Sequence, residues 1–134
     1  MAPVKAIGAI VRLDPEPESR VAGLEHQLAE QRDEADSLLA EYNAGEWVLG
    51  RLHCWSAIER PGRQLERRDG IVVDGVWLRV GDPDAALRHA HEMLTMSIPD
   101  VHAELRAAGI DIDCAALERM PADIELDPEV QAYL

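Results

Sequence analysis

An Asp-Gly pair between two runs of apolar, mostly β-branched residues gives this chain its clearest structural signal. Asp74-Gly75 follows Ile71-Val72-Val73 and precedes the apolar run 76–80. Asp-Gly supplies the positive φ angles that a tight two-residue turn requires, and β-branched residues favour strands. The pattern predicts a β-hairpin over residues 71–80, so we expect antiparallel sheet. The segment 4–13 is apolar on both faces and is expected to add a buried strand.

Three Asp-Pro pairs, each followed by an acidic residue, predict helix starts. An Asp at the N-cap accepts hydrogen bonds from the unpaired N–H groups of the first turn, and Pro at the first helical position has no N–H to leave unpaired. The acid that follows suits the positive end of the helix dipole. The three sites are Asp14-Pro15-Glu16, Asp82-Pro83-Asp84 and Asp127-Pro128-Glu129. Behind the second site, a helix over 85–96 is expected to break before Pro99 and to resume over 100–108.

The first of these helices is predicted to be long and amphipathic, over residues 15–43. Its apolar positions are spaced alternately by three and four residues, which is the a/d pattern of a heptad repeat. This stripe could pack on the protein's own sheet, bind a partner, or form the seam of a two-fold homodimer. For a homodimer the predicted seam residues are Val21, Leu24, Leu28, Leu38 and Tyr42.

Residues 46–60 could form either a helix or a strand. Val48, Leu52 and Trp55 have helical spacing, and a strand here would carry large apolar groups on both faces. We therefore predict a helix that ends at Pro61-Gly62.

Together these elements predict a helix-rich α+β fold in a single domain over residues 1–134. In this fold the long N-terminal helix and a second apolar helix pack with a small antiparallel sheet, formed by the N-terminal strand and the hairpin 71–80. The acidic segment 110–134 is either part of this domain or an extension of it.

Acidic residues are concentrated towards the two ends of the chain. The net charge is −13; residues 1–46 carry ten acids and four bases, residues 47–97 seven of each, and residues 98–134 nine acids and two bases. Such a field repels phosphate and anionic lipid, so nucleic-acid and membrane-surface binding are disfavoured. It can steer association with a basic partner, although acidity also serves solubility alone. The predicted partner-binding residues are Asp123, Glu125, Asp127 and Glu129.

Composition points away from membrane and disulfide-rich classes. No apolar run approaches the roughly 20 residues that cross a bilayer, and the N-terminus lacks a signal-peptide core, so a cytoplasmic location is expected. Cys54 and Cys114 share no motif and are predicted to be free, buried thiols. Twelve of the thirteen basic residues are Arg and alanine is abundant, which indicates a GC-rich bacterial or phage genome.

Histidines supply the most suggestive candidates for catalysis or metal binding. His89 and Glu92 are three residues apart on a predicted helix, with His102 beyond Pro99, but the two-ligand spacing of His-Glu-x-x-His is absent. No phosphate-binding loop or catalytic-serine motif occurs. We therefore predict no metal, no cofactor and no catalytic residue, with a small enzyme using His89, Glu92 or His102 as the alternative.

The leading interpretation is a non-enzymatic binding or regulatory protein that presents acidic surface to a basic protein partner. An inhibitor, an immunity-type protein and a nucleic-acid mimic would all act in this way. The alternatives are the small enzyme and a structural homodimer formed through the helix 15–43.

Overall fold

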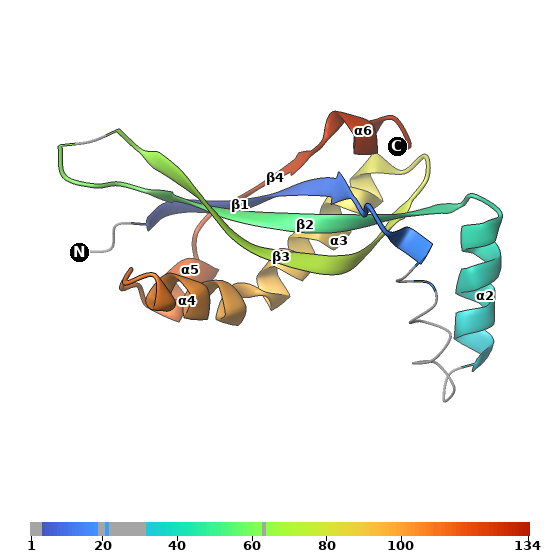
Figure 1. Cartoon of the computed structure of the whole chain (residues 1–134), viewed down its shortest axis with the longest axis horizontal. Coiled ribbons are helices and arrows are strands. Elements are labelled where there is room, and N and C mark those ends of the chain that lie inside the picture. The colour runs from blue at the N-terminus through green and yellow to red at the C-terminus, as the bar shows by residue number, and fades with distance from the viewer. Residues whose placement is uncertain (1–3, 19–20, 22–31, 63) are drawn as a thin grey trace.

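The computed structural model describes residues 4–18, 21, 32–62 and 64–134. Four strands form a mixed sheet in the order β3-β2-β1-β4, in which β2 runs antiparallel to both neighbours and β4 runs parallel to β1 (Figure 1). The strands are β1 (Val4–Leu13), β2 (Trp47–Ile58), β3 (Glu66–Arg79) and β4 (Ala122–Leu126). In the described residues the helices are α2 (Arg32–Asn43), α3 (Pro83–Met96), α4 (Ile98–Ala107), α5 (Cys114–Glu118) and α6 (Pro128–Gln131).

The predicted N-terminal strand is confirmed, but the predicted long helix over 15–43 is wrong. The N-terminus is the strand β1, and α2 is a helix of 12 residues. The middle of the predicted helix, at 19–20 and 22–31, lies outside the described residues. An amphipathic period is a local signal, whereas helix stability comes mostly from packing of the apolar face. Here α3 and α4 occupy the core face of the sheet that the long helix was expected to cover.

The prediction of a helix over 46–60 is also wrong, because residues 47–58 form the inner strand β2. A strand with neighbours on both sides and packing on both faces loses the simple alternation of apolar and polar residues. Leu52 and Cys54 are buried under the helices, while Leu49 is buried on the opposite face.

The hairpin predicted over 71–80 is wrong as well. Residues 66–79 form the single strand β3, and Asp74-Gly75 lies where the pairing of β3 with β2 is irregular. Gly50 pairs with Val76 and Leu52 pairs with Val73, so β3 has one residue more than β2 between these pairs. Gly75 has φ of +77°, so its conformational freedom serves a β-bulge instead of a turn.

The helix-start signals of α3 and α6 are confirmed. Asp82 accepts a hydrogen bond from the Ala85 N–H at 3.0 Å, and Asp127 accepts one from the Glu129 N–H at 3.0 Å. The predicted interruption near Pro99 is confirmed too, since α3 ends at Met96 and α4 begins at Ile98.

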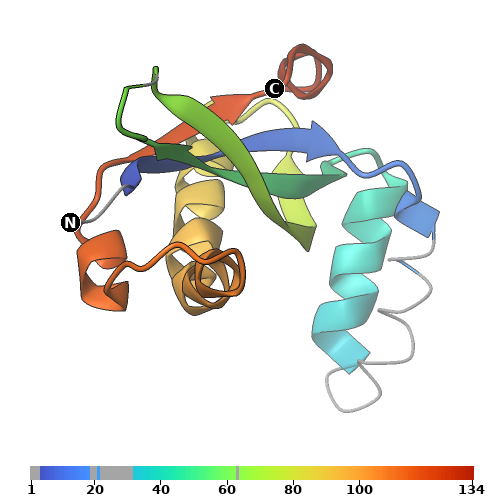
Figure 2. The ribbon, with the colours of Figure 1, turned by 60° about the vertical axis from the view of Figure 1, so that its left-hand side comes forward.

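Helices α3 and α4 cover one face of the sheet, and the core lies between these two layers (Figures 1 and 2). Its largest side chains, each almost fully buried, come from both layers: Ile7, Leu52, Leu78, Leu94 and Leu105. The C-terminal segment belongs to this body, because β4 pairs with β1 and Val130 of α6 is fully buried.

Candidate functional site

The face of the sheet opposite α3 and α4 carries no described helix over most of its length (Figure 2). Arg68 points to the helix side, where it forms a bidentate ion pair with Glu104 of α4, so its neighbour Arg67 points to the other side. We call this other side the open face. By strand register it presents Gly8, Ile10 and Arg12 of β1, Arg51, His53 and Trp55 of β2, Arg67, Asp69 and Val72 of β3, and Asp123 and Glu125 of β4.

Trp55 is the centre of one half of the open face. Its ring lies against Gly8, because a Cβ built on Gly8 would come within 2.3 Å of Trp55 Cζ2. The Arg67 guanidinium carbon lies 4.1 Å from the centroid of the Trp55 ring, which is cation–π distance. Arg67 Nη2 is also 3.7 Å from Glu125 Oε2. Since β3 and β4 are the two outer strands, the Arg67–Glu125 ion pair spans the sheet above Trp55.

Among the residues that the structure describes, carboxylates outnumber cations around this ring. Asp69 is directly opposite Trp55 in the β2–β3 register, and Asp123 is directly opposite Gly8 in the β1–β4 register. Both are exposed. With Glu125 they place three carboxylates around an aromatic ring that one guanidinium covers. The local charge and the ring face both favour a cation.

In the other half of the open face, two arginines lie close to three carboxylates. Arg12 Nε is 3.9 Å from Asp127 Oδ2, and Arg51 Nε is 2.7 Å from Asp74 Oδ1 and 3.7 Å from Asp14 Oδ1. A small cavity of about 130 Å³ lies between the two halves. Its side-chain walls are Ile10, Arg12, His53, Trp55, Asp69 and Val72.

His53 lines this cavity as a neutral ring at neutral pH. Burial lowers the pKa of His53 below its ordinary value of 6.5, and the positive charges of Arg12 and Arg51 lower it further. Asp69 and Asp74 act against these effects. A neutral imidazole can donate one hydrogen bond and accept another, so it adds no charge to the face.

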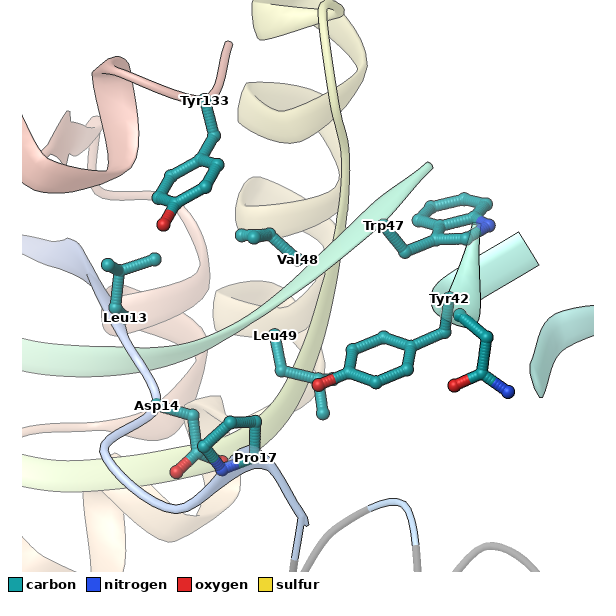
Figure 3. Close-up of a pocket in the computed structure, with 9 residues that line it drawn as sticks. Leu13, Asp14, Pro17, Tyr42, Trp47, Val48, Leu49 and Tyr133 are labelled. Atoms are coloured by element: carbon teal, nitrogen blue, oxygen red, sulfur yellow. The ribbon is translucent and has the colours of Figure 1, made fainter. Parts of the chain in front are cut away.

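A second, larger pocket of about 450 Å³ lies where the end of β1, the end of α2, the start of β2 and the C-terminus meet (Figure 3). Tyr42, Trp47 and Tyr133 supply aromatic walls, and Leu13 and Leu49 supply apolar ones. Asp14 and Asn43 add polar groups to the lining.

An aromatic cluster beside this pocket attaches α2 to the sheet. Tyr42 and Trp47 each make an edge-to-face contact with Trp77, at centroid distances of 5.8 and 6.4 Å. Trp47 Nε1 donates a hydrogen bond to Glu41 Oε2 at 2.6 Å. Leu38 is half-buried on α2, and Val21 is half-buried. Of the predicted seam residues, Leu24 and Leu28 lie outside the described part of the chain.

The four predicted partner-binding residues lie on one edge of the sheet, but they differ in their contacts. Asp123 and Glu125 are exposed on the open face, and both belong to β4, which pairs with the strand β1 that Trp55 contacts. Glu129 is exposed on α6. Asp127 caps α6 and faces Arg12, so it has a structural role. The sequence did not point to Trp55, because residues 46–60 were predicted as a helix. It did not point to Arg67 either, because Arg67 joins the site through a contact with β4.

The histidine candidates lie on two helices, His89 and Glu92 on α3 and His102 on α4. His102 Nε2 is 2.8 Å from the Ile112 carbonyl oxygen, which holds it to the segment before α5. His89 is half-buried on α3, and Glu92 is exposed. Within the described residues no group of three or more His, Cys, Asp or Glu side chains could hold a metal ion.

The two cysteines are free, as predicted. Cys54 is buried, and burial raises the pKa of its thiol to about 11, so the thiol is protonated at neutral pH. Cys114 is only half-buried, so the prediction of two buried thiols holds for Cys54 alone.

Comparisons with protein-family models, with curated proteins and with solved structures find no match to this chain. None of the helices in the described ranges is long and apolar enough to span a bilayer.

Proposed function

We propose that this protein is a non-enzymatic binding or regulatory protein that captures a basic protein partner on its open face. The observation that carries the proposal is the set of carboxylates around Trp55, namely Asp69, Asp123 and Glu125, of which β4 supplies two of the predicted partner-binding residues. Trp and Arg are enriched at the energetic centres of protein interfaces, and Trp55 and Arg67 lie between these acids.

The overall charge of the molecule supports the same partner. A net charge of −13 creates a long-range field that raises the rate of encounter with a basic surface. After this encounter, the basic surface of the partner would bind to the open-face acids. We further propose that the protein acts in the cytoplasm of a bacterial or phage-infected cell, in line with its composition.

A charge-reversal variant tests the proposal. The variant carries Asp123→Lys, Glu125→Lys and Glu129→Lys, and it spares the α6 cap Asp127. These exposed charges contribute little to stability, so the variant should fold. The matched control carries Asp111→Lys, Asp113→Lys and Glu118→Lys, which make the same charge change on exposed residues beside α5, on the helix side.

The measurement has two steps. Proteins retained from source cells by the wild type are identified and purified. Their association rates are then measured from 50 to 500 mM salt. We expect the open-face variant to slow association by about tenfold or more, and the control to slow it far less. Equal slowing by the two variants, or rates that do not depend on salt, would contradict the proposal.

A further inference from the structure

We propose that Trp55 and Glu125, with Asp123 beside them, form a binding site for an arginine side chain of the partner, and that Arg67 is an internal occupant of this site. The inference rests on the proposed function and names the group that the open face would recognise. Its basis is that the structure already holds a guanidinium group stacked on Trp55 and next to Glu125.

The ring is held in place for such a contact. Trp55 lies against Gly8 on β1, where any side chain would collide with it. The residue is half-buried, and its indole Nε1 is buried without a hydrogen-bond partner in the described structure. One side of the ring therefore rests on the sheet, and Arg67 covers the ring from above.

The internal arginine is weakly held and can be exchanged. The side chains of Arg67 and Glu125 are 43% and 47% exposed, and their closest atoms are 3.7 Å apart. Exposed ion pairs of this kind contribute little to stability, because water screens them and both side chains lose conformational freedom. An incoming guanidinium that took the same position would replace the Arg67 contacts with Trp55 and Glu125 by equivalent ones.

The local charge around the ring favours binding of a further cation. Asp69, Asp123 and Glu125 border the ring, Arg67 pairs with Glu125, and Arg12, which lines the cavity beside Asp69, pairs with Asp127. Among these described residues, carboxylates outnumber guanidinium groups when Arg67 is in place. A guanidinium is planar, so it can stack on the ring and present N–H groups to a carboxylate at the same time. An ammonium group is compact and strongly hydrated, and it lacks the planar stacking surface. The site should therefore prefer arginine to lysine.

The test uses two probes, hexa-arginine and hexa-lysine peptides, titrated into the full-length protein. Binding is followed by NMR through the indole N–H signal of Trp55, assigned by its loss in Trp55→Leu. Arg67→Ala empties the site. Its control is Arg60→Ala, which removes an equally charged, exposed residue that pairs with Glu66 instead.

If the site exists, hexa-arginine should shift the Trp55 signal and bind more tightly than hexa-lysine. Arg67→Ala should strengthen hexa-arginine binding about threefold or more, and Arg60→Ala should strengthen it less. Glu125→Gln should weaken it more than Glu59→Gln, whose carboxylate pairs with Lys5. The Arg67→Ala and Glu125→Gln comparisons use the peptide affinity alone, which any shifting signal reports, so they do not depend on whether Trp55→Leu folds.

Equal binding of the two peptides, or equal effects of Arg67→Ala and Arg60→Ala, would overturn the arginine site. In that case the proposed function survives if the open-face charge-reversal variant still weakens binding of both peptides more than its control does. If that variant and its control weaken both peptides equally, the proposed function fails together with the site.

Discussion

Gly8 shows how one residue can shape the open face. It is the position on β1 where the neighbouring Trp55 ring and the Asp123 carbonyl oxygen come within 2.3 Å of a built Cβ. The absent side chain lets the ring lie on the sheet, where it can accept a guanidinium. In sequence, Gly8 appears only as a weak point in an apolar strand, because the close approach involves residues more than 40 positions away.

Gly8→Ala should destabilise the protein by about 1–3 kcal/mol, because the ring and a backbone carbonyl must both move to admit one methyl group. Urea unfolding followed by tryptophan fluorescence measures this. Gly70→Ala is the control, since the nearest atom to its built Cβ is the Cys54 carbonyl oxygen at an ordinary 3.5 Å. Equal stability of the two variants would show that Trp55 does not pack as described.

His53 should make stability depend on pH. Its pKa in the folded protein lies below that of the unfolded chain, through burial and then through Arg12 and Arg51. As the pH falls through 6.5 towards the folded-state pKa, the unfolded chain binds a proton that the folded protein does not, so the free energy of unfolding decreases. His53→Gln should reduce this loss between pH 7 and pH 5. Replacing the exposed His91 by Gln should not.

At the scale of elements, signals that depend only on nearest neighbours along the chain were predictable. Asp82 and Asp127 cap their helices as expected, since a cap is made within three residues. The strands β2 and β3 were not predictable in the same way. β2 carries large apolar groups on both faces, Leu52 towards the helices and Trp55 among the charged groups of the open face. Asp74-Gly75 of β3 can serve a bulge as well as a turn.

The candidate site was predictable in part for the same reason. Asp123 and Glu125 stood out as an acidic run, and they are exposed on the open face. Arg51, His53 and Trp55 alternate along the sequence, so they share one face of the sheet if the segment is a strand. Trp55 could have been identified only from this alternation, after the segment was known to be a strand. Arg67 is part of the site through a contact with β4, nearly 60 residues away in sequence.

At the scale of the whole molecule, the open face and α2 offer separate surfaces. Carboxylates surround Trp55 in the middle of the sheet, whereas α2 stands at one end of it (Figure 1). The helix is attached through Tyr42 and Trp47, which pack with Trp77, and its residues Leu38 and Leu39 remain partly exposed. A second copy of the chain could cover these leucines without blocking Trp55.

We therefore predict a homodimer that forms through α2. Light scattering after size exclusion, at tens of micromolar protein, should give twice the chain mass of 14.8 kDa. Leu38→Glu with Leu39→Glu should return the mass to that of one chain, because two buried carboxylates would carry a large desolvation cost at a helix–helix seam. Met96→Glu is the control, since Met96 is 81% exposed on α3, away from α2. A single-chain mass for the wild type would exclude the dimer. Loss of the dimer in Met96→Glu, but not in the Leu38→Glu, Leu39→Glu variant, would show that the interface involves α3 and not α2.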